Sequence, residues 1–249
     1  DIPFCGRSAD VKCRKVDSMR QILKDYKHFA TLLYFPFYLI AFFLIEHFIT
    51  EDYTVIHCSL DDSIPFLEIF IVPYLLWFAF FAAVLLYLGL TDKREYYQYF
   101  LLLSVGMTIF IVVSIVFPNG QNLRPQLDAD KNFFTALVAS IYSADTPTNV
   151  FPSIHVYNAV AAQFALMHHK TCPGFVKAAG LILSGLICLA TVFLKQHSIL
   201  DGIGGLTMGG VLIYFTYYFK PTLRFFSRIS PYVKPFRLHR PVPSAEFMD

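Results

Sequence analysis

Long apolar runs separated by short polar segments dominate the pattern of this chain. A run of about 20 apolar residues is long enough to cross the hydrocarbon core of a bilayer as a helix. The pattern therefore predicts an all-α integral membrane bundle of six transmembrane helices, one for each run. The predicted spans cover residues 29–49, 66–90, 96–117, 150–167, 175–194 and 199–219.

The composition agrees with this pattern. Apolar residues make up 56% of the 249 residues and charged residues only 15%, and the mean hydropathy is +0.53. Ordinary soluble domains carry about 25% charged residues, so the composition excludes an ordinary soluble protein. We expect the bilayer as the chain's surroundings and no nucleic acid among its partners. The five cysteines lack the spacing of a zinc site or a disulfide framework.

Two basic segments flank the predicted bundle. Residues 1–28 form a basic N-terminal segment, and the helical spacing of its apolar residues predicts an interfacial helix in part of it. Residues 29–219 form the six-span membrane domain, which we expect to be the catalytic one. Residues 220–249 form a basic, proline-rich tail.

The basic residues also predict the orientation. Of the 20 Lys and Arg residues, all but Arg124, Lys131 and Lys195 lie in the N-terminal segment, the tail and the two turns on the same side. Cytoplasmic loops carry an excess of Lys and Arg. The pattern therefore predicts a multi-pass protein with both termini cytoplasmic and the candidate site extracytoplasmic. We expect it in the plasma membrane.

A histidine and an aspartate stand out in the connection between the fifth and sixth spans. His197 and Asp201 are four residues apart, so they share a face if the helix has begun. A carboxylate beside an imidazole fixes its tautomer and favours the protonated ring that develops when the other nitrogen attacks. This spacing is typical of an activated nucleophilic histidine. A His–Asp pair that only joins two helices has the same spacing, and both interpretations stand at this point.

Two further stretches fall on the same predicted face. Ser153 and His155 open the fourth span, where the free N–H groups of a helix N-terminus favour phosphate. Arg124 can bind phosphate oxygens through two N–H groups, and Lys195 adds a second cation. Each residue also has a purely structural interpretation, such as a helix cap for Ser153. Their convergence on a sparsely charged face favours one anion site, in which His155 protonates a leaving oxygen and His197 attacks phosphorus.

The order and spacing of these residues resemble the three motifs of the type-2 phosphatidic acid phosphatase superfamily, K-x6-R-P, P-S-G-H and S-R-x5-H-x3-D. The corresponding stretches are Phe117-x6-Arg124-Pro125, Pro152-Ser153-Ile154-His155 and Ala190-Thr191-x5-His197-x3-Asp201. The resemblance covers the third predicted span through the sixth.

The resemblance implies a role for each matching residue. His197 would be the phosphoryl-accepting nucleophile, Asp201 its orienting partner and His155 the general acid. Arg124 and Ser153 would hold phosphate oxygens. The implied substrate is a lipid phosphate or phospholipid, and neither a metal ion nor another cofactor is implied.

The chain departs from the motifs at three positions. Phe117 replaces a lysine, Thr191 an arginine and Ile154 a glycine, so two phosphate-binding cations are absent and Lys195 is the candidate to replace one. This smaller cation set is similar to the branch that contains inositol phosphorylceramide synthase, which transfers head groups between lipids. We predict a lipid phosphate phosphatase that acts through a phosphohistidine. A lipid head-group phosphotransferase and a non-catalytic phosphate- or lipid-binding protein are the alternatives.

Overall fold

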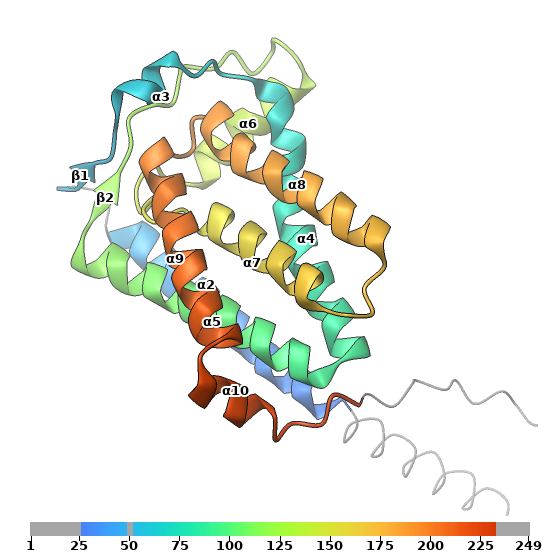
Figure 1. The fold of residues 1–249 in the computed structure, drawn as a ribbon. Coiled ribbons are helices and arrows are strands. Elements are labelled where there is room, and N and C mark those ends of the chain that lie inside the picture. The colour runs from blue at the N-terminus through green and yellow to red at the C-terminus, as the bar shows by residue number, and fades with distance from the viewer. Residues whose placement is uncertain (1–25, 49–51, 233–249) are drawn as a thin grey trace, which may run out of the picture.

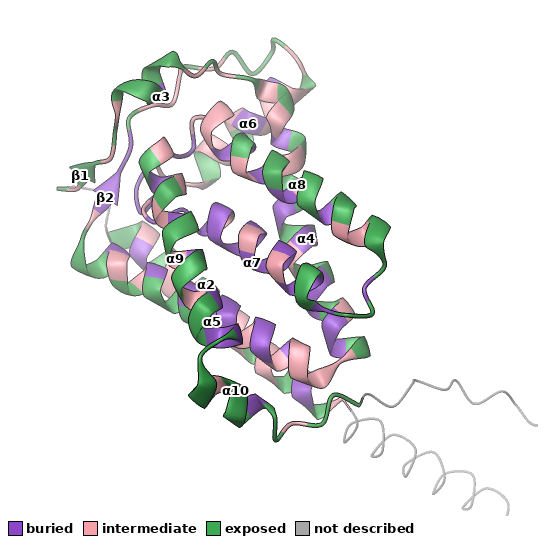
Figure 2. Ribbon diagram, viewed as in Figure 1, coloured by how far each residue is buried: buried purple, intermediate pink, exposed green. Residues whose placement is uncertain are grey.

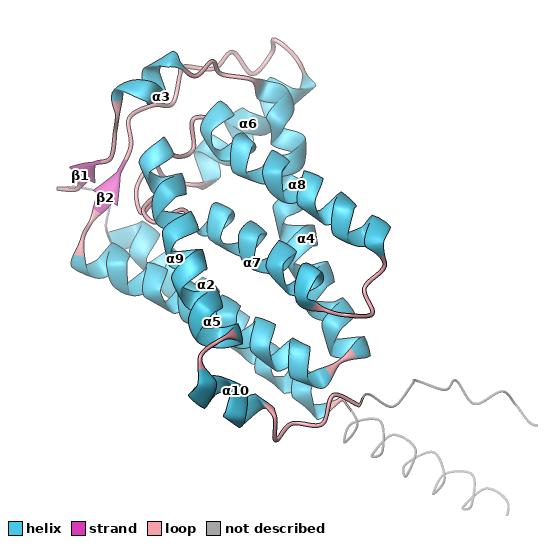
Figure 3. Ribbon diagram, in the orientation of Figure 1, coloured by secondary structure: helices cyan, strands magenta, loops and turns pink. Residues whose placement is uncertain are grey.

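A computed structural model describes residues 26–48 and 52–232, which are mainly helical (Figure 1). Strand structure within this part is limited to two-residue segments (Figure 3). The predicted all-α membrane bundle is therefore confirmed as a fold class. The interfacial helix expected within residues 1–28 falls almost wholly outside the described residues, as does the end of the tail.

Five helical segments of the described chain are long and apolar enough to cross a membrane. They are η1 (Lys27–Leu33) with α2 (Tyr34–Phe48), η2 (Glu68–Phe70) with α4 (Ile71–Thr91), α5 (Lys93–Val116), α8 (Gly174–Phe193) and α9 (Ile199–Tyr217). They expose large apolar side chains such as Phe43, Phe78 and Leu181, and Figure 2 shows many exposed residues along these helices. Helices that are apolar on the outside as well as the inside are typical of membrane spans, so the chain is a multi-pass membrane protein.

The predicted fourth span differs from the other five. Helix α7 (Ile154–His168) has 15 residues, which extend about 22 Å at 1.5 Å per residue. It begins at Ile154 rather than near residue 150, because Ser153 is an extended N-cap. It packs against α4, α5, α8 and α9, and most of its side chains are buried (Figure 2). Six membrane crossings therefore remain a prediction, with α7 as the inner helix of the bundle.

Small residues allow α9 to approach the start of α7 closely. A Cβ atom on Gly205 would lie 2.5 Å from the carbonyl oxygen of Ser153, so only glycine fits there. The Ser153 N–H donates to the carbonyl of Asp201 at 2.9 Å. Close backbone packing of this kind is common between membrane helices with small residues. Here it brings the start of α7 beside the start of α9.

Short elements connect the spans at this same end of the bundle (Figure 1). They are β1 (Thr54–Val55), α3 (Ser59–Ser63), β2 (Asn119–Gly120) and α6 (Phe133–Ala144). Strand β1 pairs in parallel with β2, and α6 packs on η2 and α4. The apolar-run pattern predicted no helix between residues 118 and 149, so α6 was not anticipated. Helix α10 (Lys220–Phe226) lies at the opposite end (Figure 1).

Candidate functional site

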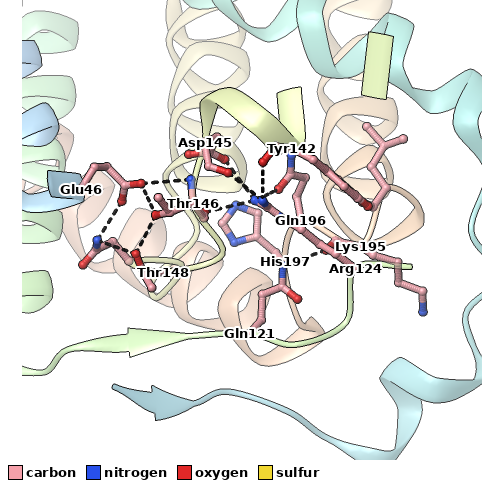
Figure 4. Close-up of polar contacts among 12 residues, drawn as sticks. Glu46, Gln121, Arg124, Tyr142, Asp145, Thr146, Thr148, Lys195, Gln196 and His197 are labelled. Atoms are coloured by element: carbon pink, nitrogen blue, oxygen red, sulfur yellow. Dashed lines mark hydrogen bonds and ion pairs between the residues drawn. The ribbon is translucent and has the colours of Figure 1, made fainter. Parts of the chain in front are cut away.

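Three connecting segments meet at the end of the bundle where α7 and α9 begin (Figure 4). Gln121, which follows β2, donates from its amide nitrogen to the carbonyl of Lys195 at 3.0 Å. Arg124 donates to the carbonyl of Asp145 at 2.6 Å and to the amide oxygen of Gln196 at 2.5 Å. The segments before α6, after α6 and between α8 and α9 thus form one polar cluster.

The two predicted catalytic histidines face each other. Nδ1 of His155 lies 3.2 Å from Nε2 of His197. On the other side of the His197 ring, Nδ1 lies 3.5 Å from Oδ2 of Asp201, an ion-pair distance. His197 is 6% exposed and Asp201 fully buried. A carboxylate facing Nδ1 favours the proton on that nitrogen and leaves the lone pair of Nε2 directed toward His155.

The connection from α8 to α9 fixes the position of His197. Lys195 has a φ of 52°, which reverses the chain direction directly after α8. The N–H groups of Gln196 and His197 both donate to the carbonyl of Thr191, at 3.0 and 3.1 Å. Ser198 then caps α9, and its N–H donates to Oδ2 of Asp201 at 2.8 Å. The aspartate that faces His197 is therefore also the capping partner at the start of the helix.

His155 is enclosed by aromatic rings. Its ring centroid lies 4.7 Å from that of Tyr74 and 4.3 Å from that of Trp77, both on α4. Ser153 is fully buried, and its hydroxyl accepts from the Val156 N–H at 3.4 Å. Both predicted residues therefore lie at the N-terminus of α7, as the sequence indicated. The hydroxyl of Ser153 acts as a helix cap here, and its role toward phosphate stays a prediction.

Arg124 is held in place mainly by protein oxygens. Besides Asp145 and Gln196, its guanidinium donates to the carbonyl of Thr146 at 3.1 Å and lies 4.6 Å above the ring of Tyr142. Its Nε has no partner within the described chain, and neither does Nε2 of Gln196. A buried donor without a partner costs about 1–3 kcal/mol. Two such donors beside His197 are suited to an anion that supplies oxygen acceptors.

Gln196 was missed by the sequence analysis. It is 2% exposed, directly precedes His197, and accepts a hydrogen bond from Arg124 at its amide oxygen. Its place next to His197 was the available signal. The pattern of charged and titratable residues does not indicate Gln196, because an amide side chain is uncharged and does not titrate in the physiological range.

Glu46 was also not among the predicted site residues, because it lies in the first span, far from every motif. Its carboxylate accepts from the N–H and the hydroxyl of Thr146 and, at 2.8 Å, from the amide of Asn149 (Figure 4). The neighbouring Asp145 has its pKa raised to about 6, chiefly by burial, although Arg124 opposes the shift. The first span therefore anchors the segment that holds Arg124.

The side chain of Lys195 points away from His197 (Figure 4). Its ammonium donates to the carbonyl of Asp61 at 2.6 Å, and it borders an open cavity of about 570 Å³ together with His57 and Asp62. The structure therefore groups Arg124, Ser153, His155, His197 and Asp201 at one place and leaves the ammonium of Lys195 outside that group. Its assignment as a phosphate ligand is still a prediction.

The carboxylate of Asp61 holds the start of α9 from the other side. Oδ2 accepts from the Ser198 hydroxyl at 2.6 Å, and Oδ1 accepts from the Ile199 N–H at 2.8 Å. Burial alone would raise the pKa of Asp61, but these hydrogen bonds and those from Cys58 lower it below its ordinary value. Within the described residues, no group of three His, Cys, Asp or Glu side chains is placed to hold a metal ion.

Residues 117–225 match the model of the PAP2 superfamily. Comparisons with curated proteins and with solved structures found no match. The matched region runs from the end of α5 into α10 and contains all six predicted site residues. It also contains the paired histidines with Asp201 behind one of them, in the order of the superfamily's motifs. Residues 117–225 are therefore similar to the PAP2 superfamily.

Proposed function

We propose that this chain is a lipid phosphate phosphatase that cleaves a phosphoester through a phosphohistidine on His197. One observation carries the proposal: Nε2 of His197 faces His155 at 3.2 Å while Asp201 lies behind the same ring at 3.5 Å. This arrangement has a nucleophile, an orienting carboxylate and a proton donor in line. The match of residues 117–225 to the PAP2 superfamily supports action on a phosphoester in general.

In the first step, the lone pair on Nε2 of His197 attacks phosphorus, and the bond from phosphorus to the lipid oxygen breaks. His155 gives a proton to that oxygen, so the lipid leaves as an alcohol. Asp201 stabilises the positive charge that develops on the ring of His197. The substrate phosphate has to enter between the two rings, which are held mainly by α7 and by the connection to α9.

In the second step, a water molecule attacks phosphorus from the opposite side. His155, now without its proton, accepts a proton from that water. The bond from phosphorus to Nε2 of His197 breaks, inorganic phosphate leaves, and both histidines return to their starting state.

The phosphate oxygens are assigned to the donors around His197. Arg124 supplies the positive charge, and its Nε and the Nε2 of Gln196 are the donors without a partner in the described residues. The N-terminus of α7 at Ser153 contributes a further donor region. Lys195 can reach this site only if its bond to Asp61 is broken, so we give it the smaller role.

We place the site on the extracytoplasmic side and both termini in the cytoplasm. Arg224 lies in α10, and Arg94 donates to the carbonyl of Ile229 just after it. Helix α10 lies at the end of the bundle opposite α3 and α6 (Figure 1). The positive-inside rule assigns that end to the cytoplasm. The plasma membrane is the proposed location.

A lipid head-group phosphotransferase is the second candidate. Thr191 replaces a cation of the motifs, is fully buried and donates its hydroxyl to the carbonyl of Cys188 at 2.8 Å. A pocket with fewer cations suits a phosphodiester, which carries less charge than a monoester. In that case an acceptor hydroxyl, rather than water, attacks the phosphohistidine. The third candidate is a non-catalytic protein that binds a phosphate or a lipid, in which neither histidine reacts.

Product partition tests these three candidates. Purified protein is supplied with a lipid phosphate, and inorganic phosphate is measured as a lipid alcohol or inositol is added. A phosphatase releases phosphate at a rate that barely responds to the acceptor. If phosphate release falls while a new phospholipid appears, the transferase is correct instead.

The variant His197→Ala completes this test, with His57→Ala as its matched control. His57 is an exposed histidine near the same end, paired with Asp62 at 3.0 Å. We expect turnover to disappear in His197→Ala and to persist in His57→Ala. Equal activity in the two variants would refute the phosphohistidine mechanism.

A further inference from the structure

An apolar groove lies between the first span and α4, on the face of the bundle that meets lipid. It encloses a cavity of about 540 Å³. Tyr38, Trp77 and Leu85 line it as buried residues, and Phe78 and Leu86 line it as exposed ones. The lining is aromatic and aliphatic throughout, which suits a hydrocarbon chain.

One end of this groove is formed by a residue of the candidate site. The indole of Trp77 lines the groove and lies 4.3 Å from the ring of His155, measured between centroids. Trp77 is 6% exposed, and its Nε1 has no hydrogen-bond partner in the described chain. Tryptophan N–H groups usually find a partner when buried. A ligand with a polar atom at this point and an apolar chain beyond it would match both features.

We propose that this groove binds the hydrocarbon chain of the substrate. Its phosphate end then lies between His155 and His197, and Trp77 marks the junction of head and chain. The inference rests on the proposed function, because the histidine pair locates the phosphate end. Any lipid-facing groove is covered by bilayer lipid, but this one ends on a ring that packs against the proposed general acid.

The length of the groove predicts a chain-length preference. From Trp77 to Leu86 the axis of α4 advances about 13 Å, at 1.5 Å per residue. An extended chain advances roughly 1.2 Å per bond, so the groove accommodates about eleven carbons. Because α4 runs from the site toward the other side of the membrane, the chain points from the phosphate into the bilayer.

Ala82 offers a way to shorten the groove without touching the site. It lines the groove five residues beyond Trp77, which is about 7 Å along the helix axis, near the sixth carbon. Ala82→Trp would fill the groove from there onward. Ala83 is the matched control, because it is exposed on the same helix and is not among the groove residues.

The first experiment compares alkyl phosphates of six and sixteen carbons with purified full-length protein. We expect Ala82→Trp to lower kcat/KM for the sixteen-carbon substrate about tenfold or more, since each buried methylene adds to binding. The six-carbon substrate should be unaffected in Ala82→Trp, and both substrates should be unaffected in Ala83→Trp. Equal losses on both substrates, or no loss on the longer one, would overturn the proposal.

The second experiment does not depend on turnover. A sixteen-carbon alkyl phosphate with a photoreactive diazirine at its eighth carbon is irradiated with the protein, and labelled peptides are mapped by mass spectrometry. We expect label within residues 77–86 of the unmodified protein and of His197→Ala, and loss of that label in Ala82→Trp. In the unmodified protein, label in the groove without any turnover would refute the proposed function and keep the groove. Turnover with label elsewhere would refute the groove and keep the function.

Discussion

Two carboxylates flank the connection between α8 and α9, the buried Asp61 and the partly exposed Asp145, and they behave in opposite ways. Asp61 accepts hydrogen bonds from Ser198, Ile199 and Cys58, and its pKa is lowered. Among the described residues, the carboxylate of Asp145 accepts a hydrogen bond from Arg124 alone, at 3.4 Å, and partial burial raises its pKa to about 6. Burial alone therefore does not decide the charge of a carboxylate here. The number of hydrogen bonds that favour the ionised form decides it.

The two carboxylates also mark two sides of the same connection. On the side of Asp61, bonds to Ser198 and Ile199 hold the start of α9, and Lys195 lies beside an open cavity. On the side of Asp145, the enclosed cluster of Arg124 and Gln196 lies beside His197. We interpret the first side as an anchor and the second as the site of chemistry, and the predictions below test this division.

The largest effect is expected for Asp201→Asn, which keeps an oxygen to cap α9 but removes the charge that orients His197. Turnover should fall about a thousandfold or more, because the imidazole loses its tautomer control and the stabilisation of its developing charge. Steady-state rates of purified protein measure this. Asp62→Asn, at an exposed aspartate on the anchor side, is the control and should keep its rate. Comparable rates in the two variants would contradict the role of Asp201.

Arg124 and Lys195 are expected to differ, since one lies on each side. Arg124→Ala removes a charge-assisted contact to phosphate and should lower kcat/KM by roughly 10- to 150-fold, from about 1.5–3 kcal/mol. Arg124→Lys should recover only part of this, because the forked geometry is lost. Lys195→Ala should change kcat/KM less than about threefold. A loss in Lys195→Ala as large as that in Arg124→Ala would make Lys195 a phosphate ligand and break the division.

The arrangement of long elements was accessible from the sequence, and the site only in part. Apolar runs predict spans because a bilayer demands about 20 apolar residues wherever one crosses. The spacing of His197 and Asp201 predicts a shared face for the same local reason. The contacts of Glu46 with Thr146 and Asn149 join residues about 100 positions apart, and no local pattern encodes such a distance.

Two smaller features show the same limit. Helix α6 is apolar and short, and it packs on η2 and α4 beside a polar loop, so length alone did not reveal it. The direction of Lys195 depends on its φ of 52° and on the carbonyl of Asp61. Both are set by tertiary packing. Residue type and spacing therefore predicted which residues take part, while the direction of each side chain required the fold.

The pH dependence of stability should have opposite signs at the two carboxylates. The pKa of Asp145 is higher in the folded state, so the folded chain binds more protons there than the unfolded chain between about pH 4 and pH 6. Rising pH through this window therefore destabilises the native protein relative to Asp145→Asn. Asp61 has a lowered pKa, so its contribution is present above the ordinary value and is lost as the pH falls through the folded value.

Thermal unfolding in detergent at pH 4, 5, 6 and 7 measures both effects. The Tm of the unmodified protein should fall relative to that of Asp145→Asn as the pH rises from 4 to 6, and stay constant above that. Asp61→Asn should lower Tm at pH 7, because hydrogen bonds to a charged group contribute about 1.5–3 kcal/mol. A Tm difference for Asp145→Asn that is the same at all four pH values would contradict the raised pKa.

The smallest effect is expected from chelation. The proposed chemistry uses two histidines and an arginine, with no carboxylate pair facing the phosphate as a two-metal site requires. Activity should therefore be unchanged in excess EDTA, while vanadate, which mimics phosphoryl transfer, should inhibit. On the anchor side, the exposed Asp62 and His57 border the open cavity instead. If EDTA abolished turnover and Asp62→Asn did the same, a metal on that side would be the reactive centre. The assignment of the two sides would then have to be exchanged.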